Sequence, residues 1–303
     1  MPRHDRDAGP VVGLIGLGNM GAPMAAHLKG VVGELRLFDA RAEVTARVAE
    51  ETGGRATASL AELGRGADIV ITMLPNADVV RAVVLGEGGE ALADALAPGA
   101  IVVDMSSSFP PATKELGAAL KARGIVLLDA PVSGGVRKAV AGTLAIMLGG
   151  DDAAALVRAE PVLASMGKIF RTGPLGSGHA IKALNNFVSA AGLAAAAEAV
   201  IVGEKFGLDP GVIVDVLNAS TGRNNSTEVK MHQFVLNRAF NSGFALDLMA
   251  KDIKAAADLA EGLGLEMPNL AAAAALWRQA QGALGKGADH TEIARYLAPR
   301  EDG

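Results

Sequence analysis

The feature that most constrains the fold is a G-x-G-x-x-G pattern near the N-terminus, formed by Gly16, Leu17, Gly18, Asn19, Met20 and Gly21. The pattern follows an apolar run at 11–15 and opens a helical stretch at 20–29. An acidic residue, Asp39, ends the next apolar run. Together these features are typical of the Rossmann arrangement that binds a dinucleotide, whereas the glycines alone would indicate only a tight strand-to-helix turn.

Each position in this arrangement has an expected role. Gly16 permits the tight turn, Gly18 lets a pyrophosphate approach the backbone, and Gly21 lets the helix pack on the strand. Asp39 would accept hydrogen bonds from the ribose hydroxyls and repel the 2′-phosphate of NADP, which favours NAD. Arg41 is the opposing signal, because a guanidinium can pair with that phosphate. NAD is therefore the predicted cofactor, and NADP stays possible.

Strand-like and helical segments alternate over the first half of the chain. The expected strands are 11–15, 35–39, 68–74, 101–105, 125–129, 143–148 and 169–172, and the helices between them are 20–29, 41–51, 78–84, 89–96 and 112–123. Nearly continuous apolar strands in a βαβα order predict an α/β fold, with a parallel sheet covered by helices on both faces.

After Gly173 the strand signals stop. Long Ala-rich helical stretches follow at 179–206, 210–219, 246–262, 269–284 and 291–297. We therefore predict a mobile tail at 1–10, a Rossmann-type parallel sheet domain at 11–173, and an all-α domain for substrate binding and oligomerisation at 174–303.

Composition narrows the functional classes. The net charge is −5, with a pI of about 5.6, which argues against a nucleic-acid partner. The chain has no cysteine, which excludes thiolate catalysis and disulfides, and no metal site is predicted. No signal peptide is recognisable. The uncharged run at 183–197 is expected to be too short to cross a bilayer, because a membrane-spanning helix needs about 20 residues. A cytoplasmic location is the expectation.

Two loops lie at the carboxyl ends of predicted strands, where ligands bind in such sheets. One is formed by Leu74, Pro75 and Asn76, and the other is centred on Ser107. We predict that both contact the cofactor. The alternative is ordinary turn chemistry, which Pro, Asn and Ser favour.

Four segments resemble the signatures of the β-hydroxyacid dehydrogenase family. They are LIGLGNMGAPMAAHL at 14–28, DAPVSGG at 129–135, GHAIKALNN at 178–186, and Phe244 with Leu248, Lys251 and Asp252. The motifs occur in the family's order and span residues from about 11 to the low 290s. The resemblance implies hydride transfer between a nicotinamide dinucleotide and a small hydroxy acid or its semialdehyde.

The resemblance places the catalytic lysine and asparagine at Lys182 and Asn186. These residues are four apart, so they share one helix face. Hydride removal from an alcohol requires a group that takes the hydroxyl proton, and a desolvated lysine can do this near neutrality. The alternative, a solvated helix lysine, is disfavoured because Lys182 begins the uncharged run. The five histidines are poorly placed to take that proton. His4 is in the tail, His27 is on the first helix and His179 lies beside the better motif, while His232 and His290 stand alone.

The other predicted site residues serve the substrate and the nicotinamide. The segment Ser133, Gly134 and Gly135 offers backbone N–H groups that suit a carboxylate, or else forms a flexible turn. The resemblance places Lys251 on the nicotinamide side, the alternative being an ion pair with Asp247. Phe244 either walls the site or belongs to the core, and Asp252 is interpreted as structural. Arg223 is a weaker candidate for a second acidic group.

Two rival functions share this architecture: an imine reductase and a non-catalytic dinucleotide sensor. Related proteins of both kinds generally lack the lysine, so Lys182 argues against them. The apolar helix that begins near 179 predicts a homodimer or homotetramer that buries it. The predicted partner is a small carboxylate substrate, without nucleic acid or membrane.

Overall fold

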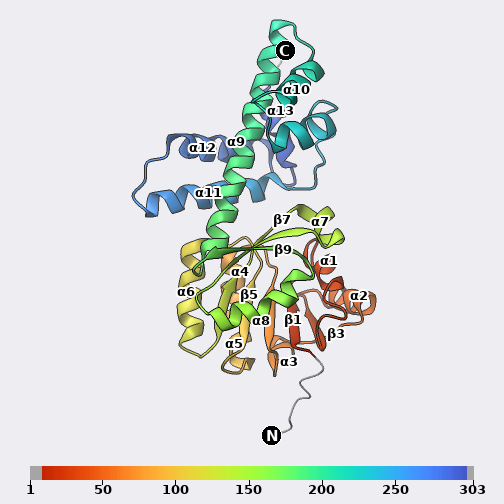
Figure 1. Cartoon of the computed structure of the whole chain (residues 1–303), viewed down its shortest axis with the longest axis vertical. Coiled ribbons are helices and arrows are strands. Elements are labelled where there is room, and N and C mark those ends of the chain that lie inside the picture. Colours follow the sequence, from red (N-terminus) through yellow and green to blue (C-terminus); the bar gives the residue numbers. More distant parts are fainter. Residues whose placement is uncertain (1–8, 299–303) are drawn as a thin grey trace. The chain divides into compact units, whose positions relative to one another are not determined.

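A computed structural model describes residues 9–298. Most of the predicted N-terminal tail, residues 1–8, lies outside the described residues. The chain divides into two compact units, one ending at Lys182 and the other beginning at Ala183. Figure 1 labels most of the helices and several of the strands.

The first unit contains one nine-stranded sheet in the order β3-β2-β1-β4-β5-β6-β8-β7, with β9 paired to β8. Its strands are β1 (Val11–Ile15), β2 (Glu34–Phe38), β3 (Arg55–Ala56), β4 (Ile69–Thr72), β5 (Ile101–Asp104), β6 (Val126–Asp129), β7 (Val132–Ser133), β8 (Leu144–Gly149) and β9 (Gly167–Gly173). The first six strands pair in parallel and have the 3-2-1-4-5-6 order of a Rossmann domain.

The prediction of a parallel sheet is wrong for the last strands. β8 pairs antiparallel with β6 and β7, and β9 is parallel to β8. The segment between β7 and β8, 134–143, is shorter than the dozen or so residues that a parallel crossover needs. The chain therefore turns back at this point, and the strands after it run against the first six.

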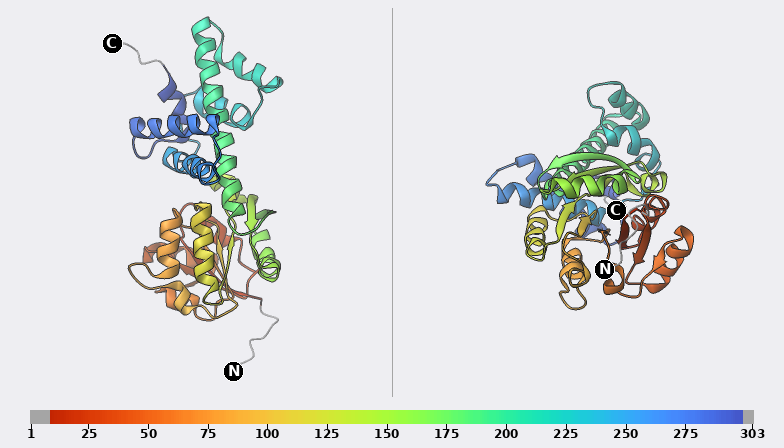
Figure 2. Two further views of the ribbon diagram at one scale, coloured as in Figure 1. Left: turned by 90° about the vertical axis from the view of Figure 1, so that its left-hand side faces the viewer. Right: turned by 60° about the horizontal axis from the view of Figure 1, so that its bottom comes forward.

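Helices cover both faces of this sheet, as predicted (Figure 2). They are α1 (Gly21–Ala26), α2 (Ala42–Thr52), α3 (Leu60–Gly64), α4 (Ala77–Leu85), α5 (Leu92–Ala95), α6 (Pro110–Lys121), α7 (Gly135–Ala141) and α8 (Ala153–Ala164). Consecutive strand residues lie on opposite faces of the sheet. Leu14 belongs to the apolar cluster that includes residues of α1, α2 and α8, whereas Ile15 belongs to the cluster that includes residues of α3 to α6. The helix α8 was not predicted from the sequence, because it contains Pro161 and proline usually breaks a helix interior.

The second unit is helical, as predicted. It contains most of α9 (Ser177–Phe206), then α10 (Pro210–Ala219), the π-helix η1 (Thr227–Val235), α11 (Leu246–Gly262), α12 (Pro268–Leu284), the 3-10 turn η2 (His290–Glu292) and α13 (Ile293–Leu297). Its core surrounds the fully buried Trp277 and includes Leu193 and Ile253. The π-helix was not predicted, because no sequence pattern specifies it.

The helix α9 is long and apolar enough to cross a membrane by length and composition alone. The expectation that this segment is too short was therefore wrong, because the helix extends well beyond its uncharged run. Core helices of soluble proteins pass the same test. α9 places Ala190, Leu193 and Val200 in the core of the second unit, as such a helix does.

Candidate active site

The glycine turn after β1 has the geometry that a dinucleotide requires. Gly16 has a φ of +92°, which favours glycine, and its N–H donates to the Phe38 carbonyl at 2.9 Å. A Cβ atom on Gly21 would collide with the Gly16 carbonyl, whereas one on Gly18 would meet no heavy atom within 4 Å. Gly18 and Asn19 are exposed. The turn therefore leaves its outer edge open to a pyrophosphate at the start of α1.

Asp39, just after β2, is held beside this turn. Its carboxylate accepts hydrogen bonds from the N–H of Leu17 at 2.8 Å and from the N–H of Arg41 at 3.0 Å. Burial raises the pKa of Asp39, but these hydrogen bonds and the Arg41 charge outweigh it and leave the pKa below its ordinary value. The largely exposed Arg41 side chain reaches Asp39 with its Nε at 3.5 Å. Asp39, whose carboxylate favours NAD, and Arg41, whose guanidinium could favour NADP, are thus in contact.

The two predicted cofactor loops are hydrogen-bonded to each other. The N–H of Leu74 donates to Ser106 Oγ at 2.8 Å, and the N–H of Ser106 donates to the Asp104 carboxylate at 3.0 Å. Asn76 caps α4, because its side-chain oxygen accepts a hydrogen bond from the N–H of Val79 at the start of that helix. Pro75 and the half-buried Ser107 lie in these same loops. The structure therefore brings the loops after β4 and β5 together at one edge of the sheet.

A buried polar network that the sequence did not predict connects these loops to the first turn of α9. His179 donates its backbone N–H to Asp129 at 2.8 Å, and its ring contacts the Ser106 carbonyl at 3.1 Å and Thr113 Oγ1 at 2.8 Å. Burial raises the pKa of Asp129 above its ordinary value, although His179 opposes this effect. His179 thus fixes the turn that precedes Lys182. The network joins the ends of β5 and β6 to the helices α6 and α9, which local sequence patterns do not reveal.

Lys182 and Asn186 lie on α9, one turn apart, and both are buried, with exposed fractions of 8% and 6%. The side-chain amide of Asn186 donates to Asp252 Oδ2 at 2.6 Å. Lys251 Nζ lies 3.0 Å from the other carboxylate oxygen of Asp252. Asp252, interpreted from the sequence as structural, therefore connects two predicted site residues.

The segment at Ser133 begins a helix and is not a free turn. Ser133 ends β7, while Gly134 and Gly135 have φ values of +133° and +66°, which favour glycine. Gly135 is the first residue of α7. At the other end of α7, His27 Nε2 lies 2.9 Å from the Ala139 carbonyl. His27 therefore holds the C-terminal end of this short helix.

The histidines expected to stand alone have partners. His232 contacts Asp215 at 3.0 Å, and the buried His290 contacts Ser242 at 3.0 Å. The Phe244 ring packs edge-on against the His290 ring, with centroids 5.5 Å apart. Arg223 is exposed and lies 3.6 Å from Glu228.

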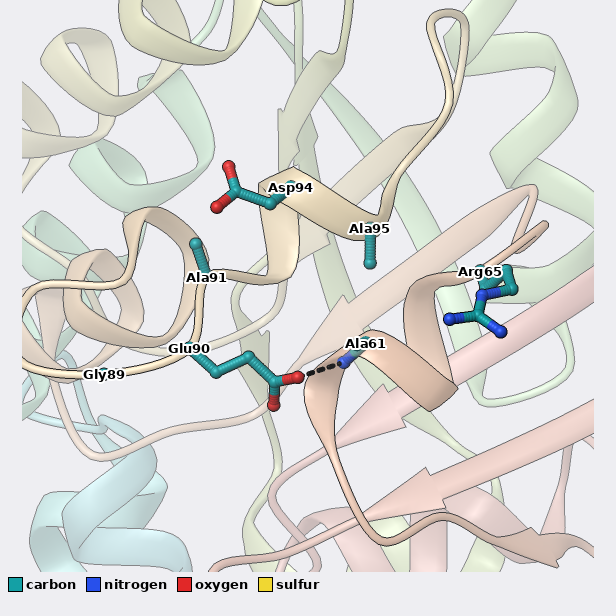
Figure 3. A pocket seen from close by; sticks show the side chains of 7 residues that line it. All are labelled: Ala61, Arg65, Gly89, Glu90, Ala91, Asp94 and Ala95. Atoms are coloured by element: carbon teal, nitrogen blue, oxygen red, sulfur yellow. Dashed lines mark hydrogen bonds between the residues drawn. The ribbon is translucent and has the colours of Figure 1, made fainter.

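One surface pocket lies away from all of these residues. Figure 3 shows it between α3 and α5, lined by Ala61, Arg65, Gly89, Glu90, Ala91, Asp94 and Ala95. Glu90 points to the start of α3 and accepts hydrogen bonds from the N–H groups of Leu60 and Ala61. Its carboxylate thus caps a helix, and the pocket contains none of the predicted site residues.

Comparisons with known proteins cover both units. Residues 11–176 match the NAD-binding domain of 6-phosphogluconate dehydrogenase, and residues 176–297 match the NAD-binding family of NADP-dependent 3-hydroxyisobutyrate dehydrogenase. The chain is 38% identical over 264 residues to 2-(hydroxymethyl)glutarate dehydrogenase of Eubacterium barkeri, with 86% of each chain covered. A structure of Mycobacterium tuberculosis 3-hydroxyisobutyrate dehydrogenase with L-serine has a TM-score of 0.86 at 34% identity, covering 96% of this chain and 100% of that one.

Imine reductases are more distant. The Myxococcus stipitatus enzyme, solved with NAD⁺, is 17% identical, with a TM-score of 0.63 over 95% of this chain and 99% of that one, and it shares the fold alone. The matched families bind NAD(P), and the relatives above 30% identity include dehydrogenases and a 3-sulfolactaldehyde reductase. The chain belongs to the β-hydroxyacid dehydrogenase family.

Proposed function

We propose that this protein transfers a hydride between a nicotinamide dinucleotide and a small β-hydroxy acid or its semialdehyde, with Lys182 as general acid and base. The observation that carries the proposal is the buried pair of Lys182 and Asn186 on one face of α9. Burying a lysine near the start of an apolar helix costs free energy, and a catalytic role explains why the protein keeps it there. The family relatives supply the reaction class.

The residues of the first unit fit a bound dinucleotide. The turn from Gly16 to Gly21 would hold the pyrophosphate, because its outer edge is open at Gly18 and α1 begins there. Asp39 would accept hydrogen bonds from the adenosine ribose, and the loops at Leu74–Asn76 and Ser107 would contact the rest of the cofactor. We assign Lys251 to the nicotinamide end. When bound, the nicotinamide supplies the hydride chemistry.

The proposed proton path uses only the chain's own groups. During alcohol oxidation, neutral Lys182 accepts the hydroxyl proton at Nζ; during reduction, its ammonium donates a proton to the carbonyl oxygen. Asn186, oriented by Asp252, hydrogen-bonds the same substrate oxygen. The backbone N–H groups of Gly134 and Gly135, with the Ser133 hydroxyl, hold the substrate carboxylate. Phe244 supplies an apolar contact.

The proposal also assigns separate roles to the two halves of the chain. Residues 11–173 bind the cofactor, and residues 174–303 contribute substrate contacts and self-association. α9 exposes Val188, Val202 and Phe206 by 66%, 69% and 84%, which supports a homodimer or homotetramer. Light scattering at micromolar concentration tests this assignment, and a monomer would contradict it. We assign the protein to the cytoplasm, where nicotinamide-dependent enzymes of small metabolites act.

A substrate panel tests the reaction. The protein is mixed with NAD or NADP and with 3-hydroxyisobutyrate, glycerate, 4-hydroxybutyrate or a sulfonated analogue, and dinucleotide absorbance is followed. Turnover with at least one acid, and much weaker turnover with its neutral alcohol analogue, is expected. A sensor would bind the dinucleotide, which calorimetry detects, without turning over any acid, and that result would refute the proposal.

A further inference from the structure

The π-helix η1 directs a second lysine to α9. Lys230 lies in η1, and its Nζ donates to Ser189 Oγ at 3.1 Å. Ser189 follows Asn186 by three residues and Lys182 by seven, so the three side chains share one face of α9. Segments of π-helix occur frequently at functional sites. The face that carries the proposed catalytic pair therefore also receives the ammonium of Lys230.

The charge of Lys230 is poorly compensated within the protein. Its side chain is largely buried, and among residues 9–298 no carboxylate oxygen lies within ion-pair distance of Nζ. Burial lowers its pKa to about 8, although the charge of Asp289 opposes this effect. Asp289 itself accepts hydrogen bonds from Ser242, from the N–H of Gly243 and from Thr291. A largely buried ammonium whose hydrogen-bond partner is a neutral hydroxyl retains donors for an anion.

Arg223, the cation that the sequence suggested for a second acidic group, is in a different situation. It is largely exposed and lies beside Glu228. Exposed pairs of this kind contribute little binding energy, because water competes for both partners. Lys230 has the burial that a specific anion site requires, and Arg223 does not.

We propose that Lys230 and Ser189 bind a second anionic group of the substrate, separate from the carboxylate assigned to Ser133, Gly134 and Gly135. The inference rests on the proposed function and names its substrate class: a β-hydroxy acid with an acidic side arm. Seven residues of α-helix rise roughly 10 Å along the axis. The second anion therefore lies several bonds from the carbon that exchanges the hydride, at the end of a side arm of two or three carbons.

The test uses two substrates that differ only at the end of the arm. Both 2-(hydroxymethyl)glutarate and 2-(hydroxymethyl)pentanoate have the same β-hydroxy acid head, but the arm ends in a carboxylate in the first and a methyl group in the second. Wild-type protein is expected to prefer the first by roughly 10- to 100-fold in kcat/KM, the effect of one charge-assisted hydrogen bond. Lys230→Met should abolish most of this preference by raising KM, and Lys230→Arg should retain part of it.

Controls separate this inference from the proposed function. Lys254→Met removes an exposed lysine of α11 that pairs with Asp258, and it should leave the preference unchanged. Ser189→Ala should reduce the preference several-fold and provides a second variant if Lys230→Met folds poorly. Equal use of both substrates by the wild type, or an undiminished preference in folded Lys230→Met, would overturn the inference alone. Absence of turnover with every hydroxy acid would overturn the proposed function.

Discussion

The side-chain amide of Asn186 donates a hydrogen bond to Asp252, with Nδ2 2.6 Å from Oδ2. Both side chains are buried, and Asn185 donates to the amide oxygen of Asn186 at 3.2 Å. The amide is therefore oriented before any substrate arrives. A preorganised group loses little freedom on binding, so this contact gives α11 a direct influence on the proposed chemistry of α9.

Replacing Lys182 with Ala should lower kcat by at least about 10²-fold, because a positioned proton donor contributes 10²- to 10⁴-fold. Dinucleotide affinity, measured by calorimetry, should change little, since Lys182 lies outside the glycine turn. Asn186→Ala should impair turnover more mildly. Turnover at the wild-type level in a folded Lys182→Ala protein would exclude this residue as the general acid and base.

Replacing Asp252 with Ala should lower kcat by about 10-fold while leaving dinucleotide affinity within a few-fold. The reason is that Asn186 loses the acceptor that fixes its amide, and Lys251 loses its contact with the same carboxylate. Asp258→Ala is the matched control, because Asp258 lies on the same helix and pairs with the exposed Lys254. An equal loss of kcat in both variants would show that substitutions in α11 lower activity only by destabilising the protein. Asp252→Asn, which keeps an acceptor oxygen, should recover part of the activity.

Replacing Asp39 with Asn should reduce the preference for NAD over NADP by at least about 10-fold in kcat/KM. The carboxylate is expected to accept hydrogen bonds from the ribose hydroxyls and to repel a 2′-phosphate, whereas the amide would not repel it. The 3.5 Å contact between Arg41 and Asp39 also becomes weaker, which frees the guanidinium for that phosphate. A clear preference of the wild type for NADP would instead show that Arg41 dominates, and Arg41→Ala should then abolish that preference.

Features with a local signature were predictable from the sequence. The glycine turn, five of the first six strands and the long helix of Lys182 each follow from spacing within about 30 residues, whereas the two-residue β3 was not predicted. The reversal at β8 was missed because strand direction depends on the length of a connection whose helix, α7, was not predicted. The partners of His179 come from segments tens of residues apart, including Ser106 and Thr113. Burial of Lys230 depends on a π-helix and on distant Ser189, so no sequence pattern indicates it.

The lowered pKa of Lys230 predicts a stability that depends on pH. A free lysine titrates near 10.4, and Lys230 in the folded protein titrates at about 8. Below pH 8 both states hold the proton, and folding carries the full cost of burying the charge. Between about pH 8 and 10 the folded state releases the proton while the unfolded state keeps it. The contribution of Lys230 to the free energy of unfolding therefore increases with pH over this range. Neighbouring Asp289 and His290 have lowered pKa values and do not titrate in this window.

Lys230→Met should therefore be more stable than the wild type at pH 7, by about 2–4 °C in Tm, the response to roughly 1 kcal/mol in a domain of this size. The advantage should shrink as the pH increases from 8 to 10, because the wild-type lysine then becomes neutral. Thermal melts of both proteins at pH 7, 8, 9 and 10 measure this difference, with Lys254→Met as the control for removing an exposed lysine. A constant difference across this range would show that the charge of Lys230 is not desolvated. A variant that gains stability while it loses the preference for an acidic side arm would show that the protein retains a destabilising charge for binding.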